Sequence, residues 1–347
     1  MDKHTEKSVH GGDVYRNEVE LDFSVNINPF GMPDGVKKAL GDAIFLCTQY
    51  PDEKVSKLSE AMAKKLDVPQ ECILFGNGAS ELFVAIIHAR KPKTVLVLAP
   101  SFSGYEHSAA CEDCQVRYYY LKKEDNFELT EHFLQELIRQ IKAHEAPDLI
   151  FLANPNNPTG HAISKSEMIQ ICEAFSNIPV IFDEAYMEFG NESAIDLLKT
   201  YPMAFVCRTL SKAYGLAGIR CGFMISSQVE KLAPLFIPYA LSSVTQTIAS
   251  VVLRHADAYK ANIAAIISER ERMYREVKDY KTISFYPSNA NFLYGRTDKK
   301  DILMDMFKEK NITIRNYADT SFRITIGTSE ENEMVLDVLR RFEYANS

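Results

Sequence analysis

One lysine, Lys212, lies among residues that could together hold an aldehyde cofactor and use it. It follows the hydroxyls of Thr209 and Ser211, precedes a run of small residues, and has Arg220 eight positions after it. A lysine amine can form a Schiff base with an aldehyde, while hydroxyls and a guanidinium can hold a phosphate. The stretch RTLSKAYGLAGIRCG therefore predicts a site for pyridoxal 5'-phosphate (PLP), and the alternative is a strand and turn that carry a solvated lysine.

Two further stretches supply groups that such a cofactor needs. Asp183, in VIFDEAY, follows a run of residues typical of a buried strand, where a carboxylate is costly unless it is paired. It could pair with a protonated pyridine nitrogen, or it could cap a turn. The glycine-rich turn GNGASE leads into a predicted helix, whose free N–H groups at Ala79 and Ser80 and whose dipole favour an anion.

The order of these motifs carries a family resemblance. NPNNPTG, VIFDEAY, SKAYGLAGIRCG and FRITIGT follow one another along the chain, and together they resemble fold-type I PLP enzymes. Within that group the chain is most similar to the histidinol-phosphate aminotransferases of the class I/II aminotransferases, over nearly its whole length. The N-terminal forms HGG and NINP resemble threonine-phosphate decarboxylases instead.

The resemblance implies roles for the residues around the cofactor ring. Lys212 would hold the cofactor and act as the base, and Asp183 would keep the pyridine nitrogen protonated. Asn157 and Tyr186 would hydrogen-bond the phenolic oxygen of the cofactor. Tyr105, in PSFSGYE, would stack on the pyridine face, unless it is an ordinary tyrosine at the start of a helix.

The resemblance also implies contacts at the two ends of the site. The predicted phosphate ligands are Ala79, Ser80, Thr209, Ser211 and Arg220, joined by Tyr50 from a partner subunit, so that the active unit would be a homodimer. Arg323 would bind the substrate carboxylate, as suits a guanidinium. Arg315 would lie near the distal end of the substrate, or form a surface salt bridge. Asn28 and Tyr15 would line the mouth of the site.

Length and composition agree with a soluble enzyme. The chain has 347 residues, of which 46% are hydrophobic and 25% charged, and no window approaches eighteen uncharged apolar residues. The polar N-terminus lacks the apolar core of a signal peptide, so we expect a cytoplasmic protein without a membrane segment. Seven cysteines, an odd number, fit reduced thiols, and the pair Cys111 and Cys114 has no second pair with which to bind a metal. A net charge of −8 argues against a nucleic-acid partner.

The pattern of elements predicts where these residues lie. Apolar strand-like runs alternate with amphipathic helical patterns between residues 46 and 245, which favours a large α/β domain with a mostly parallel sheet flanked by helices. An almost uninterrupted helical pattern from Ser243 to about Tyr280 opens a smaller α+β domain, residues 246–347, into which an irregular N-terminal arm, residues 1–45, folds back. Ligands bind at the carboxyl ends of strands in such sheets. The predicted strands of the large domain are Cys72–Phe75, Thr94–Ala99, Gln115–Leu121, Leu149–Ala153, Val180–Asp183, Ala204–Arg208 and Gly222–Ile225.

The function that these expectations favour is amino transfer from a small, phosphorylated amino substrate to a 2-oxo acid. The alternative is decarboxylation by the same machinery, as in threonine-phosphate decarboxylase. A third possibility is a non-catalytic PLP-binding protein, which would be expected to lack the lysine or to carry a DNA-binding extension. Neither feature is seen in the sequence.

Overall fold

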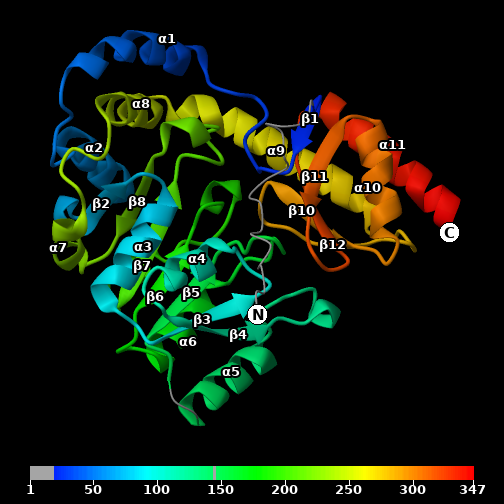
Figure 1. The fold of residues 1–347 in the computed structure, drawn as a ribbon, viewed down its shortest axis with the longest axis horizontal. Helices are drawn as coiled ribbons and strands as arrows, with labels where there is room; N and C mark the ends of the chain where they lie inside the picture. Colours follow the sequence, from blue (N-terminus) through cyan, green and yellow to red (C-terminus); the bar gives the residue numbers. More distant parts are fainter. Residues whose placement is uncertain (1–18, 144–145) are drawn as a thin grey trace, which may run out of the picture.

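The large sheet is formed by the apolar runs that alternate with helices in the sequence. The computed structural model describes residues 19–143 and 146–347. Within them, a seven-stranded sheet has the order β2-β8-β7-β6-β5-β3-β4, in which the neighbours of β8 run antiparallel to it and the other pairs are parallel (Figure 1). The strands are β2 (Ile73–Gly76), β3 (Thr94–Ala99), β4 (Gln115–Tyr120), β5 (Leu149–Ala153), β6 (Val180–Asp183), β7 (Ala204–Thr209) and β8 (Gly222–Ile225). The predicted α/β fold is confirmed.

Helices cover both faces of this sheet, as its apolar composition requires. Successive residues of a strand point to opposite faces, so Phe151 and Ile181 pack with α3 and α4 on one side, while Leu152 and Phe182 face the other cluster. The helices around the sheet are α2 (Ser56–Leu66), α3 (Ala79–Arg90), α4 (Gly104–Ala110), α5 (Glu131–Ala143), α6 (Lys165–Ala174), α7 (Val229–Leu232) and α8 (Ser243–Arg254).

The start of α6 follows the predicted capping pattern. The Ser164 hydroxyl accepts a hydrogen bond from the Glu167 N–H, and the Glu167 carboxylate accepts one of 2.6 Å from the Ser164 N–H. This capping box fixes the helix start directly after the turn that carries Asn157.

A second sheet of five strands lies beside the first in the described part of the chain. Its order is β1-β11-β12-β10-β9, and β1 pairs in parallel with β11 so that Leu21 lies opposite Ile312. The N-terminal segment thus contributes an edge strand to the C-terminal sheet. The strands of this small sheet are β1 (Leu21–Phe23), β9 (Ser284–Tyr286), β10 (Phe292–Arg296), β11 (Ile312–Asn316) and β12 (Ser321–Thr325). The helices of the same part of the chain are α9 (Ala256–Val277), α10 (Lys300–Glu309) and α11 (Ser329–Asn346).

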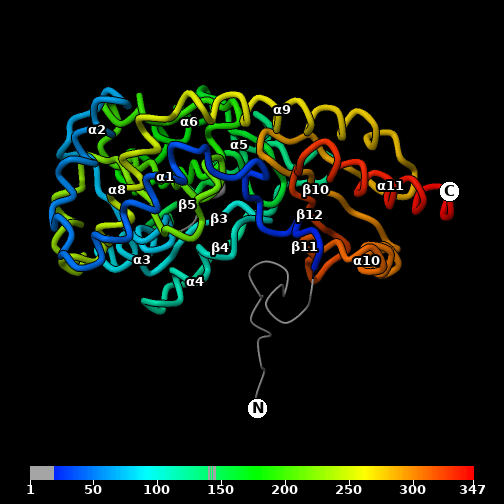
Figure 2. Tube along the Cα trace, turned by 90° about the horizontal axis from the view of Figure 1, so that it is seen from above, coloured from blue at the N-terminus to red at the C-terminus, as the bar shows by residue number. Residues whose placement is uncertain are grey.

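Two helical segments differ from the expectation. Residues 34–43, expected to be irregular, form helix α1 (Asp34–Ala43), which buries Val36 and packs against α8. The long helix expected after Ser243 is interrupted at His255, so α8 stays with the large sheet while α9 runs on toward the small one (Figure 2). Among residues 19–143 and 146–347, no helix combines the length and the apolar character that crossing a membrane requires.

Candidate active site

A cavity of about 560 Å³ lies where the N-terminal segment, the large sheet and the small sheet meet. Its volume is in the range of small-molecule sites. The residues that line it come from all three parts. Those predicted from the sequence are Ala79, Ser80, Asn157, Asp183, Tyr186, Thr209, Ser211, Lys212, Arg220, Arg315 and Arg323.

The topology of the large sheet explains this gathering. Asp183 is the last residue of β6 and lies in register with Ala153, the last residue of β5, so both strands end at one edge. Thr209 ends the neighbouring parallel strand β7, and Lys212 follows it. Carboxyl ends of parallel strands form the usual ligand-binding edge of such sheets.

The Lys212 amine is held in a poorly solvated position. Its Nζ donates a hydrogen bond of 2.9 Å to the Val25 carbonyl of the N-terminal segment. Burial lowers the pKa of Lys212 to about 8, and the positive charge of Arg323 adds to this effect, while Asp183 opposes it. At pH 7 roughly one amine in ten is therefore neutral, far more than for an ordinary lysine.

Asp183 is buried with few groups to balance its charge. Burial raises the pKa of the Asp183 carboxyl to about 6, although a hydrogen bond from Tyr105, one from the Ala185 N–H and the charge of Lys212 each lower it. Such a carboxylate is suited to pairing with a buried cation. A protonated pyridine nitrogen is a group of that kind.

An anion cradle lies at the start of α3. Gly78 has φ +83°, and a Cβ there would lie 2.2 Å from Nη2 of Arg220, so only glycine lets the guanidinium approach this turn. A Cβ on Gly222 would lie 2.5 Å from the backbone nitrogen of Ala79, so β8 also passes close to the helix start. The hydroxyls of Thr209 and Ser211, 2.9 Å apart, line the same cavity.

Two arginines from the small sheet reach the cavity. Arg315 on β11 and Arg323 on β12 are directly opposite each other in the register of the two strands. Arg323 is 6% exposed, donates to the Asn157 side-chain oxygen and to the Ser24 carbonyl, and leaves its buried Nε without a protein partner. The Arg315 guanidinium lies 5.5 Å from the ring centre of Tyr317. This end of the cavity can receive anionic substrate groups.

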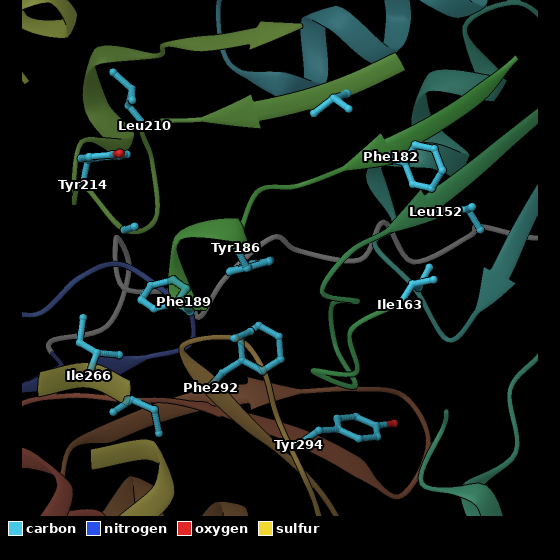
Figure 3. Packing of buried hydrophobic residues seen from close by; sticks show 14 of the residues in the cluster. Leu152, Ile163, Phe182, Tyr186, Phe189, Leu210, Tyr214, Ile266, Phe292 and Tyr294 are labelled. Carbon is cyan, nitrogen blue, oxygen red and sulfur yellow. The ribbon is translucent and has the colours of Figure 1, made fainter. Parts of the chain in front are cut away.

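Tyr186 lies between the lysine and the small sheet. Its ring meets that of Phe292 edge to face, with centres 5.2 Å apart (Figure 3), and Lys212 Nζ lies 6.0 Å from its ring centre. Burial raises the pKa of Tyr186 to about 12, against the opposing effects of the Arg323 charge and of a hydrogen bond from Asn26. The phenol is therefore protonated at neutral pH and can donate to an acceptor in the cavity.

The position of Tyr105 differs from the stacking role predicted for it. Tyr105 is completely buried behind the cavity wall, parallel to Phe151 at 4.6 Å, and its hydroxyl bonds to Asp183. Phe102, three residues earlier in the same motif, lines the cavity instead. The sequence does not distinguish the two, because both aromatic residues belong to PSFSGYE. Phe102 is therefore an aromatic side chain of this motif that is available to a flat ligand in the cavity.

Asn28 does not line the cavity, contrary to its predicted place at the substrate mouth. Its side-chain amide donates to the Ala213 carbonyl at 2.7 Å, its side-chain oxygen accepts from the Phe30 N–H, and its backbone N–H donates to the Lys212 carbonyl. Asn28 thus fastens the N-terminal segment to the turn that carries the lysine. The neighbours that do line the cavity are Ser24, Val25 and Ile27.

One predicted residue, Tyr50, lies away from the cavity of this chain. Tyr50 is 85% exposed, and its ring centre lies 5.1 Å from that of Tyr239 on the surface. Tyr15 lies outside the described residues, as does His10 of the HGG form.

The residues present fit PLP in three respects. The cradle at α3 and Arg220 supplies N–H groups, hydroxyls and a guanidinium for a phosphate. Asp183 provides a buried carboxylate for a ring nitrogen, and Phe102 an aromatic wall. Lys212 provides the amine for the aldehyde, at a lowered pKa.

Comparison with known proteins agrees with this chemistry. Residues 18–339 match the family described as aminotransferase class I and II. The chain is 32% identical to the histidinol-phosphate aminotransferase of Ruminiclostridium cellulolyticum, over 92% of each chain. It is 30% identical to the threonine-phosphate decarboxylase of Salmonella typhimurium, over 96% of each chain.

A solved structure gives the same fold. The histidinol-phosphate aminotransferase from Sinorhizobium meliloti, in complex with pyridoxal-5'-phosphate, matches with a TM-score of 0.85 at 22% identity, over 96% of this chain and 94% of that one.

Proposed function

Because the chain belongs to the class I and II aminotransferases, which are PLP-dependent, we propose that it transfers the amino group of a small phosphorylated amine to a 2-oxo acid. The observation that carries this proposal is the pair of arginines, Arg315 and Arg323, that shares a cavity with Lys212 and the anion cradle. In this proposal the cradle holds the cofactor phosphate, and the two arginines meet the anionic groups of the substrate.

The residues that would hold the cofactor divide by the part they bind. The N–H groups of Ala79 and Ser80, the hydroxyls of Thr209 and Ser211, and Arg220 bind its phosphate. Asp183 pairs with the ring nitrogen, Asn157 and Tyr186 contact the phenolic oxygen, and Phe102 covers one ring face. When bound, PLP supplies an aldehyde that condenses with amines and a ring that accepts the electron pair released at the substrate Cα.

Lys212 is the base of the proposed reaction. Its neutral Nζ takes the proton from the Cα of the amine substrate. In the second half-reaction it gives a proton to the Cα of the 2-oxo acid that receives the amino group. Its lowered pKa makes the neutral form accessible near neutral pH. Asp183 assists by staying ionised beside the ring nitrogen, because a neutral carboxyl could not keep that nitrogen protonated.

Arg323 and Arg315 orient the substrates. A phosphate brings about two negative charges into a partly desolvated site, where unpaired charge is costly. Two opposed guanidiniums can meet a phosphate, or the two carboxylates of a 2-oxo diacid in the second half-reaction. L-histidinol phosphate, the substrate named for the relatives, is therefore the first amine to test.

Decarboxylation is the second candidate, and the similarity to the Salmonella enzyme favours it over other reactions. Threonine phosphate carries both a carboxylate and a phosphate, which Arg323 and Arg315 could hold one each. The two reactions differ in the bond broken at Cα, to hydrogen or to the carboxylate. An amino alcohol phosphate has no carboxylate to lose.

One assay separates the two candidates. The PLP-loaded protein is incubated with L-histidinol phosphate or with L-threonine phosphate, with and without 2-oxoglutarate, and both glutamate and CO2 are measured. We expect glutamate formation that requires histidinol phosphate and 2-oxoglutarate together. Release of CO2 from threonine phosphate without a 2-oxo acid would replace the proposal with the second candidate.

The active unit in this proposal is a homodimer. Several large apolar side chains are exposed in two stretches of the sequence, near residue 46 and near residue 245. They include Ile44, Phe45, Tyr50, Ile237 and Tyr239. A second copy of the chain would cover them and bring its Tyr50 to the cofactor phosphate. Sedimentation should give a dimer, and Tyr50→Phe should weaken PLP binding while Tyr344→Phe, another exposed tyrosine, should not. An active monomer would contradict this part of the proposal.

A further inference from the structure

Asn26 is a buried polar residue beside the active site to which the sequence assigned no role. It has no exposed surface and adopts a left-handed backbone conformation, with φ +57°. Asparagine tolerates this conformation better than most residues. A buried polar side chain on strained backbone must be stabilised by its contacts.

Each polar group of Asn26 has a partner. Its Nδ2 donates to the Tyr186 hydroxyl oxygen at 3.0 Å. Its Oδ1 lies 2.9 Å from the Thr325 hydroxyl oxygen, whose single proton it shares with the Phe23 carbonyl at 2.7 Å. Its backbone N–H donates to the same Thr325 oxygen at 3.0 Å, and its carbonyl accepts from Asn291 Nδ2 at 3.0 Å. Asn26 therefore connects the phenol of Tyr186, on the large domain, to strand β12, which also carries Arg323.

This contact restricts what the Tyr186 hydroxyl can do. An amide nitrogen donates but cannot accept, so the phenol oxygen is the acceptor in this hydrogen bond. The single proton of Tyr186 then points elsewhere. The ring is fixed by its edge-to-face contact with Phe292 (Figure 3), and the side chain lines the cavity, so the cavity is the side on which the proton can find an acceptor.

We propose that Asn26 is a positioning residue, which makes Tyr186 a hydrogen-bond donor to the phenolic oxygen of the cofactor. The inference rests on the proposed function, because it requires PLP in this cavity. Without Asn26 the phenol could turn its proton toward the Thr325 side of the pocket, and the hydrogen bond to the cofactor would weaken. Asn26 does not itself touch the reacting atoms.

The proton on the nitrogen that joins Lys212 to the cofactor gives a direct readout. A donor to the phenolic oxygen stabilises the charge on that oxygen once the nitrogen has lost its proton, so it lowers the pKa of the nitrogen. The visible absorbance of the PLP-loaded protein, followed against pH, reports this pKa without turnover. Loss of the Tyr186 donor should raise it by roughly one pH unit, the size expected for one hydrogen bond to a charged acceptor.

The experiment is a double-mutant cycle between Asn26 and Tyr186. Asn26→Gly tolerates φ +57° and removes the amide, and Asn26→Ser serves if the glycine variant does not fold. We expect Asn26→Gly to raise the pKa of the nitrogen by roughly half to one pH unit, and to add nothing once Tyr186→Phe is present. Asn291→Ala is the matched control, because it loosens the same segment without touching Tyr186, and it should leave the pKa unchanged.

The outcomes separate this inference from the function on which it rests. If Tyr186→Phe moves the pKa but neither Asn26 variant does, Asn26 does not position Tyr186. A shift that persists in the Tyr186→Phe background, or one that Asn291→Ala reproduces, would assign Asn26 to holding the segment only. If Tyr186→Phe itself leaves the pKa unchanged, the proposed role of Tyr186 is wrong, and the inference about Asn26 is overturned with it.

Discussion

The Tyr105 hydroxyl donates a hydrogen bond of 2.7 Å to Oδ2 of Asp183. The tyrosine is completely buried and its ring is stacked on Phe151, so it cannot follow the carboxylate if the latter moves. The Ala185 N–H holds the other carboxylate oxygen at 3.2 Å. Asp183 is thus fixed on both oxygens, and the tyrosine predicted to touch the cofactor acts one layer behind it.

Tyr105→Phe tests this relationship. The substitution keeps the ring packing and removes a hydrogen bond that lowers the pKa of Asp183. In the proposed mechanism the ionised carboxylate is the active form, so the acid limb of kcat/KM against pH should move to higher pH by up to about one unit. Tyr120→Phe, at an exposed position, is the control. An unchanged acid limb in Tyr105→Phe would leave this hydrogen bond without a role in catalysis.

Lys212→Ala should fold, bind PLP without a covalent link and lose turnover. Among the described lysines, Lys212 is the one that lines the cavity with the anion cradle. Borohydride reduction followed by mass spectrometry should fix the cofactor to the wild-type protein and to Lys231→Ala, but not to Lys212→Ala. Full activity in Lys212→Ala would be incompatible with the assignment.

Asp183→Asn should retain the cofactor and slow the reaction by several orders of magnitude. A neutral amide of the same shape can remain in the hydrogen-bond network but cannot keep the ring nitrogen protonated. Single-turnover measurement of proton removal from the substrate Cα checks this directly. Near-normal rates would move Asp183 to a structural role.

Lys212 should destabilise the cofactor-free protein below pH 8. Its pKa is about 8 in the folded state against 10.5 when unfolded, so the unfolded state binds more protons between these values and the free energy of unfolding rises with pH there. Lys212→Met should therefore stabilise the cofactor-free protein by roughly 2 to 3 kcal/mol at pH 7, and by little above pH 10.5. Urea unfolding at both pH values measures the difference. Lys231→Met should show no such pattern.

Arg315→Ala should separate substrates by their phosphate. Charge-assisted hydrogen bonds are worth about 1.5 to 3 kcal/mol each, so kcat/KM for a phosphorylated amine should fall roughly ten- to a hundredfold. The unphosphorylated analogue should be nearly unaffected. Arg296→Ala, which removes a small-domain arginine paired with Asp319, is the control. Equal losses for both substrates would show that Arg315 is structural.

The sequence predicted the large sheet closely because strand signals there are local. Each predicted strand overlaps an observed one, and their ends differ by at most one residue. Helix α1 was missed because it begins directly after Pro33, in a segment rich in glycine and proline, and because its burial depends on packing against α8. The interruption at His255 could not be predicted, because no proline or glycine marks it in the sequence.

The positions of Lys212 and Asp183 at the cavity were predictable, because each lies in a motif whose residue types indicate a particular chemistry. Tyr105 and Phe102 share one motif, and which of them faces the cavity depends on how α4 packs against Phe151 and Phe83. Asn26 and Asn28 are two residues apart in NINP, yet one contacts Tyr186 and the other the lysine turn. That difference is set by contacts far along the chain.

The pairing of β1 with β11 affects the order in which the protein can be completed during synthesis. Leu21 leaves the ribosome before any strand of the large sheet, but its partner Ile312 emerges only after all of those strands. The large sheet can form in the meantime, because its strands lie within residues 73–225. The segment that contacts Lys212, Tyr186 and Arg323 cannot take its final place until β11 and β12 exist. A nascent chain should therefore gain a stable large sheet well before it gains a site able to act on a substrate.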